Sequence, residues 1–454
     1  MSDLAFTIAS FLVALAILIT AHEFGHFWVA RKLGVRVLRF SIGFGTPLLR
    51  WVGRRDGTEY VIASLPLGGY VKMLDEREEA VPQSELHRAF NRQALWKRSA
   101  IVAAGPIFNF LLAIGLYWGV LVVGEEGSRP IIGTVAADSA AEAAGFAAGD
   151  ELLEVAERPT PTWEAAVFAL VSEAMDAEDL AVRVREASGA EVVRWLDGAT
   201  LAGLTETPAI LGNIGLDPAR PVIAPILAEV LEDGAARRAG IEAGDRIVAA
   251  AGEPIDTWGQ LVEIIRANPE KPVPFVIERD GTQLDLTVTP TSIVEDGQSI
   301  GQIGVAVDIP EDLDERYRVI VRLGPVEAVG AALEKTADTT ALMLRMIGRM
   351  LTGSASIENL SGPIAIAETA GKTASYGVAS FIKFLAIVSI SLAVLNLLPV
   401  PVLDGGHLLF FLIEWIKGSP LSEQAQIWGQ NIGILVLAVL ITFAVYLDLS
   451  RLLG

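Results

Sequence analysis

The sequence contains no cysteine. That absence excludes disulfide bridges, a cysteine nucleophile and zinc sites built on thiolates. Histidine is also scarce, with four residues in 454, so each histidine can be examined individually. Basic residues are the minority: 35 Lys and Arg stand against 55 Asp and Glu, which gives a formal net charge of −20. No basic surface dominates, and this argues against nucleic acid as a partner.

Hydrophobic residues, by contrast, are abundant. They make up 52% of the chain, and the mean hydropathy of +0.47 is high for a soluble protein. Four stretches come near the roughly 20 residues that a helix needs to cross a bilayer. They lie at about 5–29, 99–123, 381–402 and 432–449. We therefore expect a polytopic α-helical membrane protein with four spans surrounded by lipid. The first stretch is too long and apolar for a cleaved signal peptide, so we expect it to be retained.

The distribution of charge predicts an orientation. Residues 30–98 carry about 13 Lys and Arg against about 7 Asp and Glu, many of the basic ones beside the spans. The positive-inside rule places this segment in the cytoplasm. Two crossings then put residues 124–380, which are rich in acidic side chains, on the outer side. Both termini should face outward as well.

The outer region contains an internal repeat. The segment PIIGTVAADSAAEAAGFAAGDELLEVAERPTPTW, from Pro130, aligns without gaps to PILAEVLEDGAARRAGIEAGDRIVAAAGEPIDTW, from Pro225. Such a constant offset indicates a duplicated domain, and the period is long enough for a compact one. The sequence pattern of each copy predicts a short helix that ends at a glycine, then an apolar strand, a longer helix and further strands. We expect a small antiparallel sheet with helices in each copy.

The pattern A-G-x-x-x-G-D in both copies resembles the PDZ domains of bacterial proteases, in tandem in this chain. PDZ domains bind an extended peptide at a sheet edge and often capture its C-terminal carboxylate. The resemblance implies that peptide C-termini bind to these domains, although neither copy has an unambiguous carboxylate-binding loop. A plain spacer or steric plug remains the alternative. After the repeat, residues 324–353 have helical periodicity, which predicts a helix either on the outer membrane surface or against the duplicated domains.

The first apolar stretch contains the motif His22-Glu23-Phe24-Gly25-His26. On a helix, two histidines four residues apart share one face and can bind one metal ion, and the intervening glutamate can act as general base. A chance pattern is the alternative interpretation for any short motif. Ionisable groups inside a span are costly and usually functional, which favours a zinc site.

A third ligand is needed, and "HEFGHFWVARKLG" has no third histidine. Asp404 stands in "LNLLPVPVLDGGHLLFFLIE", at the end of the third apolar stretch. Asn396, Pro399 and Pro401 should break the helix there, since proline removes a backbone donor. Irregular backbone at membrane depth is tolerated where protein or water covers it. We expect this break to aim Asp404 toward the first span.

H-E-x-x-H in one span, paired with N-x-x-P-x-P-x-L-D-G at 396–405, resembles the signature of the site-2 protease family of intramembrane zinc metalloproteases. The segments "PLGGYVKM", "AAGPIFNF" and "SGPIAIA" also fit, so the resemblance covers essentially the whole chain. It implies one catalytic Zn²⁺ with the ligands His22, His26 and Asp404, and Glu23 as catalytic base. It further implies a multi-pass protein of the bacterial inner membrane, with both termini and the PDZ-like domains on the periplasmic side.

The same resemblance implies the substrates. They would be single-span membrane proteins, such as an anti-sigma factor, cut after a first outer-side cleavage in regulated intramembrane proteolysis. Remnant signal peptides are a further possibility. Two other functions stay open: a catalytically silent membrane scaffold that presents tandem PDZ domains, and a membrane-anchored protease of soluble misfolded proteins. Four intact site residues argue against the first, and the motif's place in a span argues against the second.

Several further residues have two interpretations. Asn396 would contact substrate by the family resemblance, or its amide would satisfy backbone freed by Pro399. Asn109, in the second span, would hydrogen-bond the site's loops or pack against a neighbouring helix. His407 follows Asp404 by three residues, and we interpret it as an outer hydrogen-bond donor rather than a ligand. His87 lies among basic residues, which is typical of a surface histidine.

Residues 39–73 alternate apolar and polar side chains between glycine-rich turns, which predicts strands. Gly43 and Gly45 would let this backbone approach another chain, so we assign them to substrate binding. In the family an equivalent membrane-dipping β element lies beside the active site, and a sheet edge could hold an unwound substrate. A solvated hairpin is the alternative.

The expected fold is thus a four-span helical membrane protein with tandem PDZ-like α+β domains outside and a cytoplasmic-side β element. We expect five parts: 1–124 with two spans and the β-rich loop, 125–217 and 218–310 as the PDZ-like domains, 311–380 as an amphipathic helical region, and 381–454 with two spans.

Overall fold

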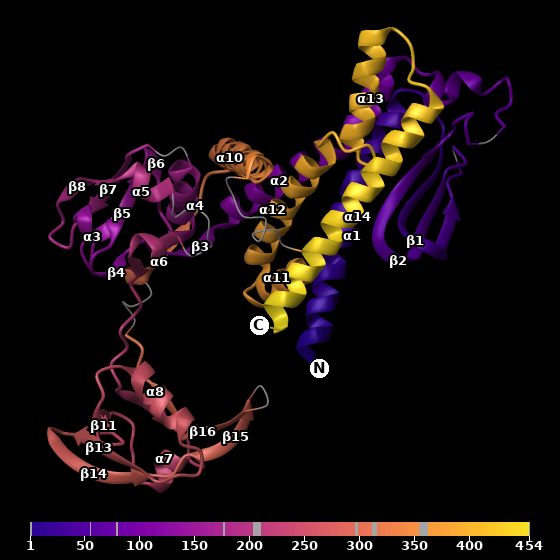
Figure 1. The fold of residues 1–454 in the computed structure, drawn as a ribbon. Coiled ribbons are helices and arrows are strands. Elements are labelled where there is room, and N and C mark those ends of the chain that lie inside the picture. The colour runs from indigo at the N-terminus through magenta and orange to yellow at the C-terminus, as the bar shows by residue number, and fades with distance from the viewer. Residues whose placement is uncertain are drawn as a thin grey trace. The chain divides into compact units, whose positions relative to one another are not determined.

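The computed structural model describes residues 2–54, 56–78, 80–175, 178–202, 210–295, 298–310, 316–353 and 362–453 (Figure 1). The chain forms two compact units. The first unit combines Met1–Glu125 with Ile320–Gly454, and the second is Glu126–Val319.

Within the described residues, four helices of the first unit are long and apolar enough to cross a membrane, as expected. They are α1 (Ser2–Lys32), α2 (Leu95–Val123), α12 (Val378–Leu397) and α14 (Glu423–Leu453). The chain therefore has the helices of a polytopic membrane protein, together with β-sheet domains. The two termini lie at the same end of the helical unit, as an even number of crossings requires (Figure 1).

The remaining helices of this unit are shorter or amphipathic. They are η1 (Leu86–Arg88), η2 (Phe90–Arg92), α10 (Glu327–Thr352), α11 (Pro363–Ser375) and α13 (Asp404–Lys417). The buried face of α10 carries Ala328 and Ala332, which pack with Tyr117 of α2 and Ile390 of α12. The expected amphipathic helix thus packs against two candidate spans, an arrangement that its sequence period alone did not predict.

Helices α1 and α2 approach each other closely. A Cβ atom on Gly25 of α1 would lie 2.4 Å from the carbonyl oxygen of Ala104 on α2. Small residues allow membrane helices to pack at such short range. This contact places the middle of α2 directly beside the H-E-x-x-H turn of α1.

The segment between α1 and α2 is β-rich, as its alternation predicted. Strands β1 (Val37–Val52) and β2 (Glu59–Met73) pair antiparallel in two registers: Phe40 faces both Val71 and Tyr60, and Trp51 also faces Tyr60. Each long strand therefore bends into two parts. Across the sheet, the segments lie side by side in the order 47–52, 59–63, 37–44 and 65–73. The last segment, which includes residues 69–73, therefore forms one edge of the sheet.

The first repeat copy of the second unit has a four-stranded sheet in the order β6-β5-β7-β8, with a separate β4–β9 pair. Its elements are β4 (Ile132–Val135), α3 (Ala140–Ala143), β5 (Glu151–Val155), β6 (Arg158–Pro159), α4 (Trp163–Ala174), β7 (Leu180–Arg185), β8 (Glu191–Leu196), α5 (Gly198–Ala202), α6 (Ile210–Ile214) and β9 (Leu216–Pro218). Val182, Leu152 and Leu170 are central to its core.

The second copy repeats this plan, with the sheet order β12-β11-β13-β14 and a β10–β17 pair. Its elements are β10 (Leu227–Val230), α7 (Ala235–Arg238), β11 (Arg246–Ala250), β12 (Glu253–Pro254), α8 (Trp258–Ala267), β13 (Val273–Arg279), β14 (Thr282–Val288), β15 (Thr291–Glu295), β16 (Gln298–Gln302) and β17 (Val305–Val307). The order of elements is the same from the first strand of each copy to the fourth strand of its sheet, which agrees with duplication. The copies then differ, because α5 and α6 stand in the first where the β15–β16 pair stands in the second. Strands β3 (Glu125–Ser128) and β18 (Arg318–Val321) lie where the chain passes between the units.

Candidate metal centre and active site

Helix α1 presents both motif histidines on one face. The Nε2 atoms of His22 and His26 lie 3.2 Å apart, and their rings meet edge to face with centroids 4.8 Å apart. Residues four apart in a helix point in nearly the same direction, which explains this approach. Glu23, the next residue after His22, lines the same cavity.

Asp404 comes to this pair from the other end of the sequence. It is the first residue of α13, after the loop in which Pro399 and Pro401 end α12. Its Oδ2 atom lies 3.2 Å from His22 Nε2 and 3.5 Å from His26 Nε2. One ligand atom from each of the three side chains falls within 4.8 Å of the other two.

The protonation of His26 shows why a cation fits between these groups. Its Nδ1 atom lies 2.8 Å from the carbonyl oxygen of Ile101, which can only accept a hydrogen bond, so a neutral ring carries its proton there. Nε2 then presents a lone pair to the carboxylate. Asp404 Oδ2 is buried and accepts no hydrogen bond, although both imidazoles lie within ion-pair distance. Mutually facing lone pairs repel, and a bound cation removes that repulsion.

His22 is held on its far side by Asn109 of α2. Asn109 is fully buried, and its amide nitrogen lies 3.1 Å from His22 Nδ1, while its Oδ1 atom has no partner. The amide oxygen and nitrogen are exchanged by a half turn of the group. In the exchanged orientation Oδ1 accepts the His22 Nδ1 proton, which leaves Nε2 free for a metal and satisfies the buried oxygen. Such outer hydrogen bonds commonly fix metal-binding imidazoles.

Two glycines to which the sequence assigned no role lie against the H-E-x-x-H motif. A Cβ atom on Gly105 of α2 would lie 2.3 Å from His26 Nε2. A Cβ atom on Gly69 of β2 would lie 2.8 Å from Glu23 Cγ. Any side chain at either position would displace a motif residue. The segments "AAGPIFNF" and "PLGGYVKM" contained this signal, but only tertiary contact reveals which glycine meets which side chain.

The motif residues open onto a cavity of about 330 Å³. Its wall is formed by His22, Glu23, His26, Gly69, Tyr70, Val71, Met73, Ile101, Val102, Asn396, Val402, Leu403 and Asp404. The β2 edge and the loop after α12 therefore enclose the site from two sides. The sequence predicted Asn396 in this wall but missed the β2 residues.

Four other residues that the sequence analysis considered lie outside this wall, and for one of them, His87, a surface position was expected. Gly43 and Gly45 of β1 have φ angles of +89° and pack near Leu65 and Ser64. The ring of His407 packs edge to face on Phe410, with centroids 6.3 Å apart. His87 is exposed on η1. Among the residues that the structure describes, none of these four contacts the ligand cluster through a hydrogen bond.

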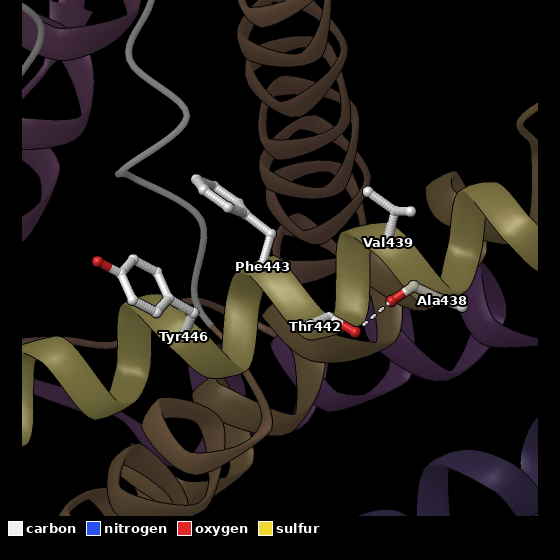
Figure 2. A pocket seen from close by; sticks show the side chains of 5 residues that line it. All are labelled: Ala438, Val439, Thr442, Phe443 and Tyr446. Carbon is white, nitrogen blue, oxygen red and sulfur yellow. Dashed lines mark hydrogen bonds between the residues drawn. The ribbon is translucent and has the colours of Figure 1, made fainter.

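A second hollow of about 490 Å³ lies on α14, away from this chemistry (Figure 2). Ala438, Val439, Thr442, Phe443 and Tyr446 line it. The Thr442 hydroxyl donates to the Ala438 carbonyl oxygen at 2.8 Å, so its one short polar side chain is satisfied within the helix. Lipid chains would fill such an apolar surface on a candidate span.

Comparison with known proteins decides the family. A family model described as "Peptidase family M50" matches residues 10–440. The chain belongs to peptidase family M50. It is 45% identical over 445 residues to "Regulator of sigma-E protease RseP" of Escherichia coli (strain K12), covering 98% of each chain. It is 44% identical over 452 residues to "Regulator of sigma E protease" of Salmonella typhi, covering all of both chains.

A third relative is named for its metal. The chain is 41% identical over 454 residues to "Putative zinc metalloprotease" of Vibrio cholerae serotype O1, covering all of both chains. This M50 chain is accordingly an enzyme, a metalloprotease of the membrane, and its cofactor is zinc. The alternative of a catalytically silent scaffold is not supported.

Proposed function

We propose that this M50 protease cleaves single-span membrane proteins within the membrane, with zinc held by His22, His26 and Asp404 and with Glu23 as catalytic base. One observation carries the proposal: the three ligand atoms converge within 4.8 Å beside Glu23, on a helix long and apolar enough to span a bilayer. Two imidazoles and one carboxylate are the donor set of open catalytic zinc sites.

Bound there, zinc supplies a Lewis acid that polarises the scissile carbonyl. Glu23 takes the proton from the attacking water and then donates it to the leaving amine. Asn109 holds the His22 ring through Nδ1, and the Ile101 carbonyl holds the His26 ring in the same way. Water reaches Glu23 through the cavity between the β2 edge and the loop after α12.

The substrate chain binds extended along the edge formed by residues 69–73 of β2. A peptide bond in a helical span is shielded by its own backbone hydrogen bonds, and a strand edge offers replacements. Gly69 lets this edge pass directly over Glu23. Asn396, at the end of α12, contacts the same chain from the opposite wall. Gly43 and Gly45 then serve to bend β1 rather than to touch substrate.

The outer copies are PDZ-like domains, at 125–217 and 218–310, on the periplasmic side of a bacterial inner membrane. They sense a newly made C-terminus or exclude substrates with large outer parts. The relatives named for regulating sigma-E suggest an anti-sigma factor, shortened by an earlier outer-side cut, as the substrate class. Remnant signal peptides have the same single-span chemistry. Both termini share the outer side with these domains.

The test is cleavage of a model single-span substrate in liposomes by the wild-type chain and by Glu23→Gln, with zinc content measured in parallel. We expect Glu23→Gln to retain zinc and to lose cleavage by about 10²-fold or more, since general-base catalysis contributes that much. Asp404→Ala should lose zinc as well. Zinc retention by Asp404→Ala, or cleavage by Glu23→Gln near the wild-type rate, would refute these assignments.

A further inference from the structure

A partly buried ion pair joins α13 to α2 at a distance from the cavity. Arg98, in the first turn of α2, donates from its two terminal nitrogens to the two carboxylate oxygens of Glu414, at 3.2 and 2.5 Å. Both side chains are only 14–15% exposed. The Arg98 guanidinium also lies 5.0 Å from the Phe411 ring centre and donates through Nε to the Gln93 carbonyl oxygen. Neither the proposed zinc site nor the proposed proton transfers use this pair.

The pair closes a ring of rigid elements around the ligand cluster. Asp404 begins α13, and Glu414 follows ten residues later, about 15 Å along the same helix. Arg98 lies in the first turn of α2, and Gly105 follows seven residues later, about 10 Å along it, against His26. The ring therefore runs from Asp404 through Glu414 and Arg98 back to the histidine face of α1.

The first turn of α13 packs against its own preceding loop. Cβ atoms on Gly405 and Gly406 would lie 2.2–2.3 Å from the Leu398 oxygen and the Pro401 backbone. That packing fixes α13 relative to the loop but not relative to the histidines. Among the described residues, Arg98–Glu414 is the charged contact that ties α13 to α2.

We propose that Arg98 and Glu414 are positioning residues, which set the direction of α13 so that Asp404 closes the zinc site. A bidentate arginine–carboxylate pair fixes geometry as well as distance. Loss of the pair lets α13 turn about its first residues, and small displacements of a ligand weaken metal binding. Outer residues that orient metal ligands typically change metal affinity by about 10- to 100-fold. This inference rests on the proposed role of Asp404 as a ligand.

The experiment measures the rate at which zinc passes from the full-length, detergent-solubilised enzyme to a chelator, well below the unfolding temperature. Arg98→Gln and Glu414→Gln should each release zinc roughly 10-fold faster or more. The double exchange Arg98→Glu with Glu414→Arg should recover most of the loss. Arg92→Gln is the matched control, because Arg92 forms a two-point pair with Glu76 that is far more exposed.

The proposal would be overturned if Arg98→Gln and Glu414→Gln release zinc at rates within twofold of the rate for Arg92→Gln. A double exchange that releases zinc as fast as the single variants would also overturn it, since a shared structural role would then explain the loss. If the charge-reversed chains fail to fold, the neutral Glu414→Gln, which keeps the side-chain shape, decides alone. Asp404→Ala distinguishes failure of the proposed ligand role from failure of the positioning role. If Asp404→Ala holds zinc normally, the assignment of Asp404 as a ligand is wrong. If Asp404→Ala loses zinc while the Arg98 and Glu414 variants keep it, only the positioning role is wrong.

Discussion

Two carboxylates, one in each unit, have opposite surroundings. Asp245 of the second repeat copy has no exposed surface, and its two oxygens accept hydrogen bonds from Arg279 at 2.7 Å each. It also accepts from the Glu242 backbone nitrogen at 2.9 Å. Asp404 of the first unit has a buried Oδ2 atom that has no hydrogen-bond partner among the described residues.

The difference separates a structural group from a reactive one. A buried charge with a full set of donors stabilises the fold around it, whereas a buried oxygen without any is unfavourable unless a ligand supplies the missing partner. Asp404 fits the second description, because two imidazole nitrogens that present lone pairs lie beside its Oδ2. The contrast predicts that removing each carboxylate has a different consequence.

Removal of the Asp404 carboxylate should have the largest functional effect. We expect Asp404→Ala to lower zinc affinity by more than about 100-fold and to abolish cleavage, because one of three ligands is gone. The metal-free form should be no less stable than the metal-free wild type, since no hydrogen bond to Oδ2 is lost and a buried oxygen without a partner is removed. Zinc titration and denaturant unfolding of the metal-free proteins would check both statements. A large loss of metal-free stability would mean that Asp404 is a structural group after all.

Removal of the Asp245 carboxylate should reverse that pattern. Asp245→Ala should destabilise the second copy by roughly 2–4 kcal/mol, because Arg279 and the Glu242 backbone lose their acceptor. This expected loss of stability lies toward the lower end of the range for broken buried ion pairs, because the Arg279 side chain is 27% exposed. Hydrogen exchange of peptides from 218–310 in the full-length chain reports this change. Zinc content should stay at the wild-type level.

The equivalent residue in the first copy is the control. Asp150 is 2% exposed and accepts from the Ala147 backbone nitrogen, as Asp245 does from Glu242. Within the described part of the chain it forms no ion pair with arginine. We expect Asp150→Ala to cost about 1–2 kcal/mol, less than Asp245→Ala. Equal losses in the two copies would mean that Arg279 contributes little to the stability of the second copy.

The sequence predicted part of this contrast. Asp150 and Asp245 recur at the repeat offset of the A-G-x-x-x-G-D pattern. The H-E-x-x-H and L-D-G motifs predicted that the side chains of His22, His26 and Asp404 lie together, as they do. The partner of Asp245 was not predictable, because Arg279 comes from a separate strand and Glu186 stands at the corresponding register position after β7. Register between strands depends on tertiary packing, which local periodicity does not encode.

The same limit applies at the cavity beside the H-E-x-x-H motif. Alternation predicted strands between α1 and α2, but two registers between β1 and β2 decide that residues 69–73 form the edge. Gly69 was therefore missed. Gly43 and Gly45 were selected because glycine permits close approach of backbone, and the structure places both outside the cavity wall. The amphipathic period of α10 likewise predicted a buried face without predicting that α2 and α12 cover it.

Acid should weaken the second copy through Asp245. Burial acts to raise the pKa of Asp245, but hydrogen bonds from Arg279 and the Glu242 backbone, with the Arg279 charge, hold that pKa below its usual range. A lowered folded-state pKa contributes stability above the unfolded value of about 3.9, and that stability is lost as pH falls through the folded value. Hydrogen exchange corrected for intrinsic rates should therefore show protection falling below about pH 4. Asp245→Asn should flatten this dependence, and an unchanged profile would contradict the linkage.

The smallest effect is expected where the two copies differ only in exposed side chains. Val193 and Trp195 of β8 are 52% and 61% exposed, and the corresponding positions of β14 hold Asp285 and Thr287. The double change Val193→Asp with Trp195→Thr gives the first copy the surface of the second. Stability should move by less than about 0.5 kcal/mol, because neither side chain is buried and a carboxylate at 193 would face Arg183 across the β7–β8 pair. Denaturant unfolding and hydrogen exchange at 180–196 measure this. A loss of several kcal/mol would show that Trp195 is covered in the working enzyme.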